Sequence, residues 1–204
     1  MSLLHAEDER LIEAKIAEIE QRTASELVVA VVPRSAAHHQ AWLGLAFAFG
    51  IPFGVLAYLV HIPPLWQYLS AFALAGLIYA LRSTPLWRAF LSKAALDAAV
   101  QERARRFFSA RGVDRTEHRT GVLLFISEFE HRVVILGDTA IHERLGDAGW
   151  QAHVDHVVSA IRRGQTTRGV LEVLDRLGAV LAELLPVAPG DRNELPNSVV
   201  REAE

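Results

Sequence analysis

The sequence predicts an α/β fold, specifically an α/β/α sandwich with a small mixed sheet that is interrupted by a transmembrane helical hairpin. Three observations support this prediction. Apolar, strand-like runs lie on both sides of a long uncharged stretch, amphipathic helices flank those runs, and the uncharged stretch is long enough for two membrane spans. Hydrophobic residues make up 51% of the 204 residues and charged residues 22%, a composition typical of a folded chain.

The membrane hairpin is predicted from the stretch between Ser35 and Leu81, which contains no Asp, Glu, Lys or Arg. Within it, Ala41–Val60 as a helix would span about 30 Å, the thickness of a bilayer's hydrocarbon core. Leu65–Leu81 gives a second, shorter span, and paired prolines separate the two. The alternative is a buried hairpin of a soluble protein, but a chain of this size has little protein with which to cover two helices that are apolar all round.

Positive charges flank this hairpin. Arg34 precedes it and Arg82, Arg88 and Lys93 follow it, whereas the link between the spans carries no positive charge. The positive-inside rule therefore predicts an integral protein of the inner (cytoplasmic) membrane whose soluble domain and both termini face the cytoplasm. Residues 5–22 mix charged and apolar side chains, so we expect no cleavable signal peptide.

The chain on either side of the hairpin is expected to build one domain. Neither part can close a core alone, because the first apolar strand is separated from the later strands by the hairpin. The expected divisions are 1–34 and 84–187 for the two parts of the domain, 35–83 for the hairpin and 188–204 for a polar C-terminal tail. Before and after the hairpin, the expected elements are a helix over Glu7–Gln21, a strand over Glu26–Val32, a helix over Trp87–Ala110 and an antiparallel pair of strands over Gly121–Ile126 and Arg132–Leu136. They are followed by a short helix that is capped by Thr139 or Asp138 and ends at Leu145, a helix over Trp150–Ile161, and a last helix that starts at Thr166 or Thr167 and ends at Leu185.

The order of these elements resembles that of the TPM domain family, in particular a bacterial branch of membrane proteins in which two spans interrupt the domain. The residues that carry the resemblance are Ser25-Glu26, Arg106-Phe107-Phe108, Thr120–Leu124, Arg132–Asp138, Gly146-Asp147 and the tail Asp191–Asn197. For some thylakoid relatives, the resemblance implies an acid phosphatase activity and the binding of divalent cations such as calcium or magnesium. The family's acidic position before its closing helices falls on Asp147. The chain departs from the family at Asp138, where an aromatic residue is common.

A candidate site follows the last predicted strand, because functional groups collect at strand ends in open α/β sheets. Asp138, His142 and Asp147 are the candidate catalytic residues, and Asp138 and Asp147 are the candidate metal ligands. Two carboxylates and an imidazole can hold a hard cation, or one carboxylate can act as general base for water attacking a phosphate ester. The alternative, which we favour, is that both aspartates cap helices.

Two other groups of polar residues have plainer explanations. His153 and His156 lie one helical turn apart and could form one edge of a metal site, but without an HExxH spacing a solvated helix face is the better interpretation. Six arginines between residues 103 and 119 could bind phosphate or anionic headgroups. Acidic residues are interleaved with them, which favours a solvated helix with ion pairs.

Several function classes are excluded by what the sequence lacks. A net charge of −3 gives no basic excess for nucleic acid, and the absence of cysteine excludes disulfides, thiolate zinc sites and cysteine nucleophiles. The chain contains no P-loop, GxSxG elbow or GxGxxG sequence. We therefore expect a membrane-anchored assembly or quality-control module that contacts the lipid bilayer and binds a membrane protein or protein complex. The alternative is a membrane-tethered phosphatase that could depend on a divalent cation.

Overall fold

The structure is a computed structural model that describes residues 5–81, 84–141, 143, 154–155, 157–161, 163–187 and 192–201, with the backbone alone at 39–42 and 85–86. The chain divides into two compact units. One combines residues 1–35 with 97–204, and the other comprises residues 36–96.

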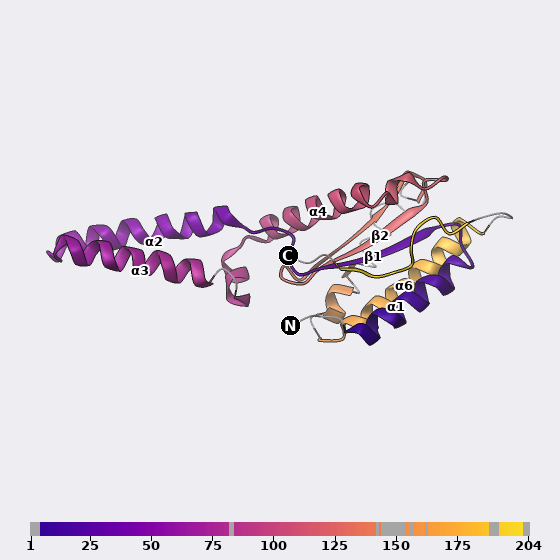
Figure 1. Cartoon of the computed structure of the whole chain (residues 1–204), viewed down its shortest axis with the longest axis horizontal. Helices are drawn as coiled ribbons and strands as arrows, with labels where there is room; N and C mark the ends of the chain where they lie inside the picture. Colours follow the sequence, from indigo (N-terminus) through magenta and orange to yellow (C-terminus); the bar gives the residue numbers. More distant parts are fainter. Residues whose placement is uncertain are drawn as a thin grey trace. The chain divides into compact units, whose positions relative to one another are not determined.

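The first unit contains a four-stranded mixed sheet, which confirms the predicted α/β class and the predicted small mixed sheet (Figure 1). Its strands are β1 (Glu26–Val32), β2 (Gly121–Ser127), β3 (Arg132–Gly137) and β4 (Val200–Arg201), in the order β3-β2-β1-β4. β1 and β2 pair in parallel over seven positions, from Glu26 opposite Gly121 to Val32 opposite Ser127. The two parts of the chain therefore share one sheet, as the sequence predicts, and β3 pairs antiparallel with β2.

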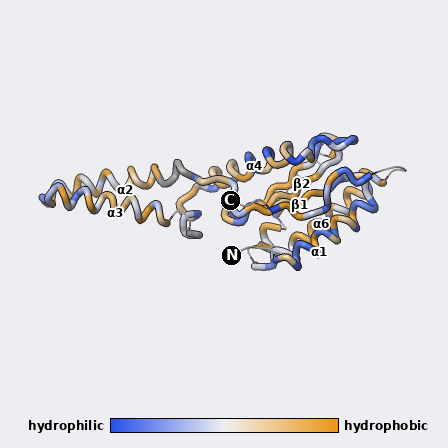
Figure 2. The backbone as a smooth tube through the Cα atoms, in the orientation of Figure 1, coloured by the Kyte–Doolittle hydropathy of each residue, from blue (hydrophilic) through white to orange (hydrophobic). Residues whose placement is uncertain are grey.

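Helices cover both faces of this sheet, which is why every residue of β1 and β2 is buried. On one face, α4 (Lys93–Ala110) packs Val100, Ala104 and Phe107 against the sheet, and the short η2 (Val113–Arg115) adds Val113. On the other face, α1 (Ala6–Glu20) and α6 (Thr166–Leu184) run side by side (Figure 1). The buried residues of both helices belong to one core with side chains of β1 and β2. Figure 2 shows hydrophilic residues interspersed with hydrophobic ones along both helices.

The helix expected over Trp87–Ala110 is interrupted, and in this respect the prediction is wrong. A short helix, η1 (Pro85–Phe90), ends at Phe90, and α4 begins at Lys93. The hydroxyl of Ser92 accepts the Ala95 N–H at 3.1 Å, and its carbonyl accepts the Leu96 N–H. Ser92 is therefore an N-cap, and this local hydrogen bonding sets the start of α4.

The second unit contains two apolar helices, α2 (His39–Leu59) and α3 (Pro64–Leu81), which contact each other. The link between them is tight, because the Ile62 N–H donates to the carbonyl of Ala57 and His61 has a φ of 57°. Of the described residues, α3 forms a helix long and apolar enough to cross a membrane, and Leu43–Leu59 forms a shorter apolar helix. Figure 2 shows apolar residues along both helices.

Candidate functional site

Of the three candidate catalytic residues, Asp138 is the one that the structure describes. His142 and Asp147 lie outside the described residues, as do His153 and His156. The triad of Asp138, His142 and Asp147 and the metal pair of Asp138 and Asp147 therefore stay predictions.

Asp138 directly follows β3 and is 5% exposed. Its Oδ1 accepts hydrogen bonds from the Thr139 N–H at 2.6 Å and from the Thr139 hydroxyl at 3.1 Å. Its Oδ2 forms an ion pair with Arg119, whose Nε lies 3.1 Å away without a well-directed hydrogen bond. Because the Asp138 carbonyl also accepts the Ile141 N–H, the residue starts the helical turn that follows it. These contacts agree with a capping role.

The sequence predicts a functional site at the carboxyl end of β3, where Asp138 lies, but the direction of β3 argues against such a site. β3 runs antiparallel to β2, so its carboxyl end lies beside the amino ends of β1 and β2. The Asp138 N–H accordingly donates to the carbonyl of Gly121, the first residue of β2. In open α/β sheets, ligands bind outside the carboxyl ends of the parallel strands. Asp138 lies at the other end of these strands, beside their amino ends. This geometry weakens the case for catalysis by Asp138.

At the carboxyl ends of β1 and β2, a buried carboxylate joins the two strands. Glu130 has no exposed surface, and the Ser127 hydroxyl donates a short hydrogen bond to its Oε2. The Ser35 N–H lies 3.1 and 3.3 Å from the two carboxylate oxygens, and the Ser35 and Ser127 hydroxyls are 2.8 Å apart. A buried carboxylate needs such donors to offset its lost hydration. No local pattern in the sequence predicts this cluster, because it joins residues that are 92 and 95 positions apart in the chain.

At the amino end of β1, Glu26 holds the C-terminal tail. Its two carboxylate oxygens accept the backbone N–H groups of Glu194 and Leu195, each at 3.1 Å. Farther along the tail, the Val199 N–H donates to Glu13 at 3.0 Å, and Arg201 pairs with Glu9. The tail, which was predicted only as polar, thus reaches the sheet and contributes β4. Its backbone donors are satisfied by carboxylates of α1 and β1.

Glu20 lies next to this tail contact and has a strongly perturbed pKa. The pKa of its carboxyl is raised from 4.5 to about 7, chiefly by burial and to a smaller extent by the nearby charge of Glu26, although contacts with the Leu27 N–H and Asn197 act in the opposite direction. Oε1 accepts the Leu27 N–H at 3.0 Å, and the buried Oε2 accepts no hydrogen bond from the described residues. Among the residues that the structure describes, no three His, Asp or Glu side chains form a metal-binding group.

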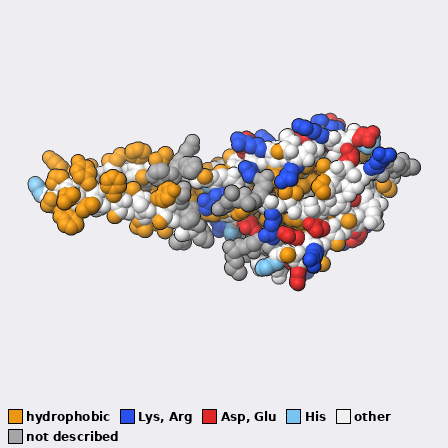
Figure 3. Space-filling view, in the orientation of Figure 1, with side chains coloured by type: hydrophobic (Ala, Val, Ile, Leu, Met, Phe, Trp, Pro, Cys, Tyr) orange, Lys and Arg blue, Asp and Glu red, His pale blue; other side chains and the backbone are white. Residues whose placement is uncertain are grey.

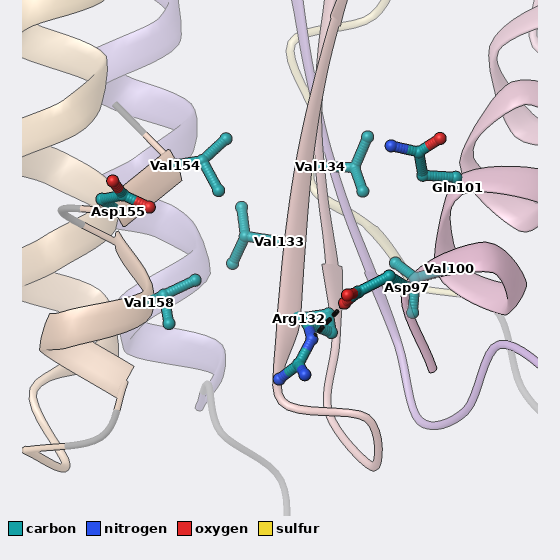
Figure 4. A pocket seen from close by; sticks show the side chains of 9 residues that line it. All are labelled: Asp97, Val100, Gln101, Arg132, Val133, Val134, Val154, Asp155 and Val158. Atoms are coloured by element: carbon teal, nitrogen blue, oxygen red, sulfur yellow. Dashed lines mark hydrogen bonds and ion pairs between the residues drawn. The ribbon is translucent and has the colours of Figure 1, made fainter. Parts of the chain in front are cut away.

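A groove lies beside β3, with a cavity of about 350 Å³ (Figure 4). Val133 of β3 faces two valines from a neighbouring helical segment, while Val134 lies towards α4. Arg132, at the start of β3, forms an ion pair with Asp97 of α4. The lining residues are Asp97, Val100, Gln101, Arg132, Val133, Val134, Val154, Asp155 and Val158.

Several of the arginines between residues 103 and 119 form contacts within the domain. Arg106 pairs with Glu102 at 2.7 Å, Arg119 pairs with Asp138, and the guanidinium of Arg111 lies over the ring of Phe107. Figure 3 shows acidic side chains interspersed among the basic ones on the visible face of this unit. These contacts agree with the interpretation of a solvated helix with ion pairs.

Comparison with known proteins gives one family and one fold. The TPM domain family model matches residues 88–180. None of the curated proteins matches the chain. Among solved structures, the chain is similar to the NMR structure of the BA42 protein from the psychrophilic bacterium Bizionia argentinensis, with a TM-score of 0.63 and 19% identity over 98% of this chain and 97% of that chain. At this identity the likeness shows a shared fold.

The matched range includes α4, the β2–β3 hairpin and most of α6, whereas α1 and β1 precede it. The resemblance expected from the sequence is therefore confirmed for this part of the chain, which contains a TPM domain at residues 88–180.

Proposed function

We propose that the chain is a membrane-anchored protein-binding module, in which the α2–α3 hairpin lies in the bilayer and the sheet domain binds another protein. The observation that carries the membrane part is the exposed apolar surface of the hairpin. Phe47, Tyr58 and Phe72 are 65%, 75% and 78% exposed, and only 6% of α3 is buried. Apolar side chains also cover the visible face of the hairpin (Figure 3). A lipid environment would remove this surface from water.

The binding part of the proposal rests on the chemistry of the described residues. Their carboxylates serve structural contacts, with Glu26 and Glu130 accepting backbone N–H groups and Asp138 capping a turn. Hydroxyl groups do lie beside two of these carboxylates, Ser127 beside Glu130 and Thr139 beside Asp138. Ser127 and Glu130 have no exposed surface, so a substrate cannot reach them, and the Asp138 carboxylate is paired with Arg119. The groove beside β3 is instead lined by side chains that suit a polypeptide.

The membrane anchor and its orientation can be tested together, because the chain contains no cysteine. We expect the protein to stay in membranes washed with alkaline carbonate and to dissolve in detergent. With single cysteines, His61→Cys should react with a membrane-impermeant maleimide from the periplasmic side. Glu7→Cys, the matched control in the cytoplasmic domain, should react only after permeabilisation. Release by carbonate would contradict the anchor, and equal labelling of the two variants in sealed cells would contradict the orientation.

Phosphoester hydrolysis is the second candidate, since residues 88–180 contain a TPM domain and the family resemblance implies an acid phosphatase activity for some thylakoid relatives. We expect purified protein, assayed with para-nitrophenyl phosphate in the presence of calcium or magnesium, to release no more phosphate than a preparation from cells lacking the protein. The hydrolase would be supported by measurable release that falls at least tenfold in Asp138→Ala. The control Glu102→Gln, at an exposed carboxyl on α4, should leave such an activity unchanged.

A further inference from the structure

The unit formed by residues 36–96 has a one-sided charge. Its sequence contains Arg82, Arg88 and Lys93 and has no Asp or Glu. With histidine counted as neutral, this unit is therefore purely cationic, whereas the whole chain has a net charge of −3. All three cations follow the end of α3 in the sequence, so the positive charge is concentrated after the second apolar helix.

Hydrogen bonds hold η1 directly after α3. The N–H and the hydroxyl of Thr84 both donate to the carbonyl of Leu81, the last residue of α3, at 2.9 and 2.6 Å. The carbonyl of Thr84 in turn accepts the Trp87 N–H at 3.1 Å, which closes the first turn of η1. In the proposed membrane arrangement, η1 therefore lies at the end of a span, at the level of the lipid headgroups.

η1 contains one buried and one exposed aromatic ring. Trp87 is 2% exposed and Phe90 is 57% exposed, and their ring centroids are 6.1 Å apart. The buried indole fixes the short helix, so that the ring of Phe90 is presented outwards from a held position. Aromatic side chains at the end of a membrane span favour the boundary between headgroups and acyl chains.

The cations beside this ring are open to an outside anion. No carboxylate in the part of the chain that the structure describes forms an ion pair with Arg88 or Lys93. Lys93 is exposed and Arg88 is half-buried. Lys93 is also the first residue of α4, where the helix dipole disfavours a cation, so its charge does not stabilise that helix. The phosphate groups of lipids are anions that lie at this level of a membrane.

We propose that the segment from η1 to Lys93 binds the headgroups of anionic phospholipids in the membrane that holds the α2–α3 hairpin. Arg88 and Lys93 interact with lipid phosphates, while the ring of Phe90 enters the boundary of the acyl chains. Phospholipids without net charge offer the same apolar boundary but no excess of negative charge, so the segment favours the anionic ones. This inference rests on the proposed membrane anchor and names the class of lipid that the anchor prefers.

The test uses the full chain in nanodiscs of phosphatidylcholine, either alone or with about 30% phosphatidylglycerol. Because the chain contains no cysteine, Ala89→Cys in η1 can carry a single environment-sensitive NBD fluorophore. We expect its emission in the anionic nanodiscs to lie at wavelengths shorter by about 10 nm than in the neutral ones. The same fluorophore on Ala110→Cys, exposed at the other end of α4, should emit alike in both.

Charge variants, made with the Ala89→Cys label, show whether the two cations cause the shift. Arg88→Gln/Lys93→Gln should raise the fraction of phosphatidylglycerol needed for half of the shift by at least about threefold. Arg10→Gln/Arg176→Gln removes the same net charge from exposed positions in the sheet domain and should leave this fraction unchanged. Lys93→Gln alone, at an exposed position, should produce part of the effect, so a folding defect of the double variant would not conceal it.

Two results would overturn the lipid assignment. One is equal emission of the Ala89→Cys label in neutral and anionic nanodiscs, and the other is an equal half-point for the two double variants. A chain that resists carbonate but gives either result would keep its proposed anchor and lose only the headgroup-binding segment. Release by carbonate would instead contradict the anchor, and the inference would fall with it.

Discussion

Replacing Gly121 with alanine is expected to destabilise the sheet domain by about 3 kcal/mol, which corresponds to a melting temperature lower by roughly 6 to 12 °C. A Cβ on Gly121 would lie 2.0 Å from the carbonyl oxygen of Val113 and 2.8 Å from its Cγ1. Val113 is fully buried in η2, so it has no room to retreat. The methyl group must therefore push β2 and η2 apart at the point where β2 begins.

Thermal unfolding of the detergent-solubilised variants, followed by circular dichroism, measures this effect. Gly76→Ala is the matched control, because a Cβ on Gly76 would meet nothing within 4 Å and alanine favours the helical backbone there. Its melting temperature should equal or exceed that of the wild type. If Gly121→Ala and Gly76→Ala melt together, the close approach of β2 to η2 is wrong.

The strands of the central sheet were predictable from local pattern. Glu26–Val32 has the predicted bounds, and the two strands of the later hairpin each extend one residue beyond the prediction. Continuous apolar runs indicate strands buried on both faces, and short spacing indicates a hairpin. The pairing of β1 with β2 was also predictable. β1 is so rich in apolar side chains that it has to be buried in a core, and the later strands offer one.

The tail strand could not be predicted in this way. β4 has only two residues, and its position depends on carboxylates of Glu26, Glu13 and Glu9, which lie more than 160 residues earlier in the chain. A polar segment that satisfies its backbone donors on distant side chains leaves no periodic pattern of its own. The Glu130 cluster could not be predicted for the same reason, because its partners come from the ends of two different strands.

The candidate site was predictable only in part. Asp138 was found because it follows an apolar strand, and its capping role follows from its position before a helical turn. The sequence pattern does not show whether the end of a strand lies beside the amino or the carboxyl ends of its neighbours, because that depends on strand direction. The antiparallel β3 places Asp138 at the amino ends of the parallel pair.

The largest effect of pH is expected at Glu20, where burial and the neighbouring Glu26 raise the pKa of the carboxyl to about 7 from its ordinary 4.5. The folded state therefore favours the protonated acid more strongly than the unfolded state does. The stability contributed by this group is complete below about pH 4.5 and is lost as the pH rises through about 7. After allowance for solvent screening of this partly buried side chain, the loss between pH 5 and pH 8 is about 2 kcal/mol.

Glu20→Gln should remove this loss, because an amide stays neutral over the whole range and its Oε1 can still accept the Leu27 N–H. Thermal unfolding at pH 5 and pH 8 measures the effect. We expect the variant to match the wild type at pH 5 and to exceed it at pH 8 by a few degrees. Glu7→Gln, at an exposed carboxyl near the start of the same helix, should retain the pH dependence of the wild type. Parallel pH profiles for Glu20→Gln and the wild type would mean that the ionised Glu20 is already stabilised, with Asn197 and the Leu27 N–H outweighing the effects of burial and of Glu26.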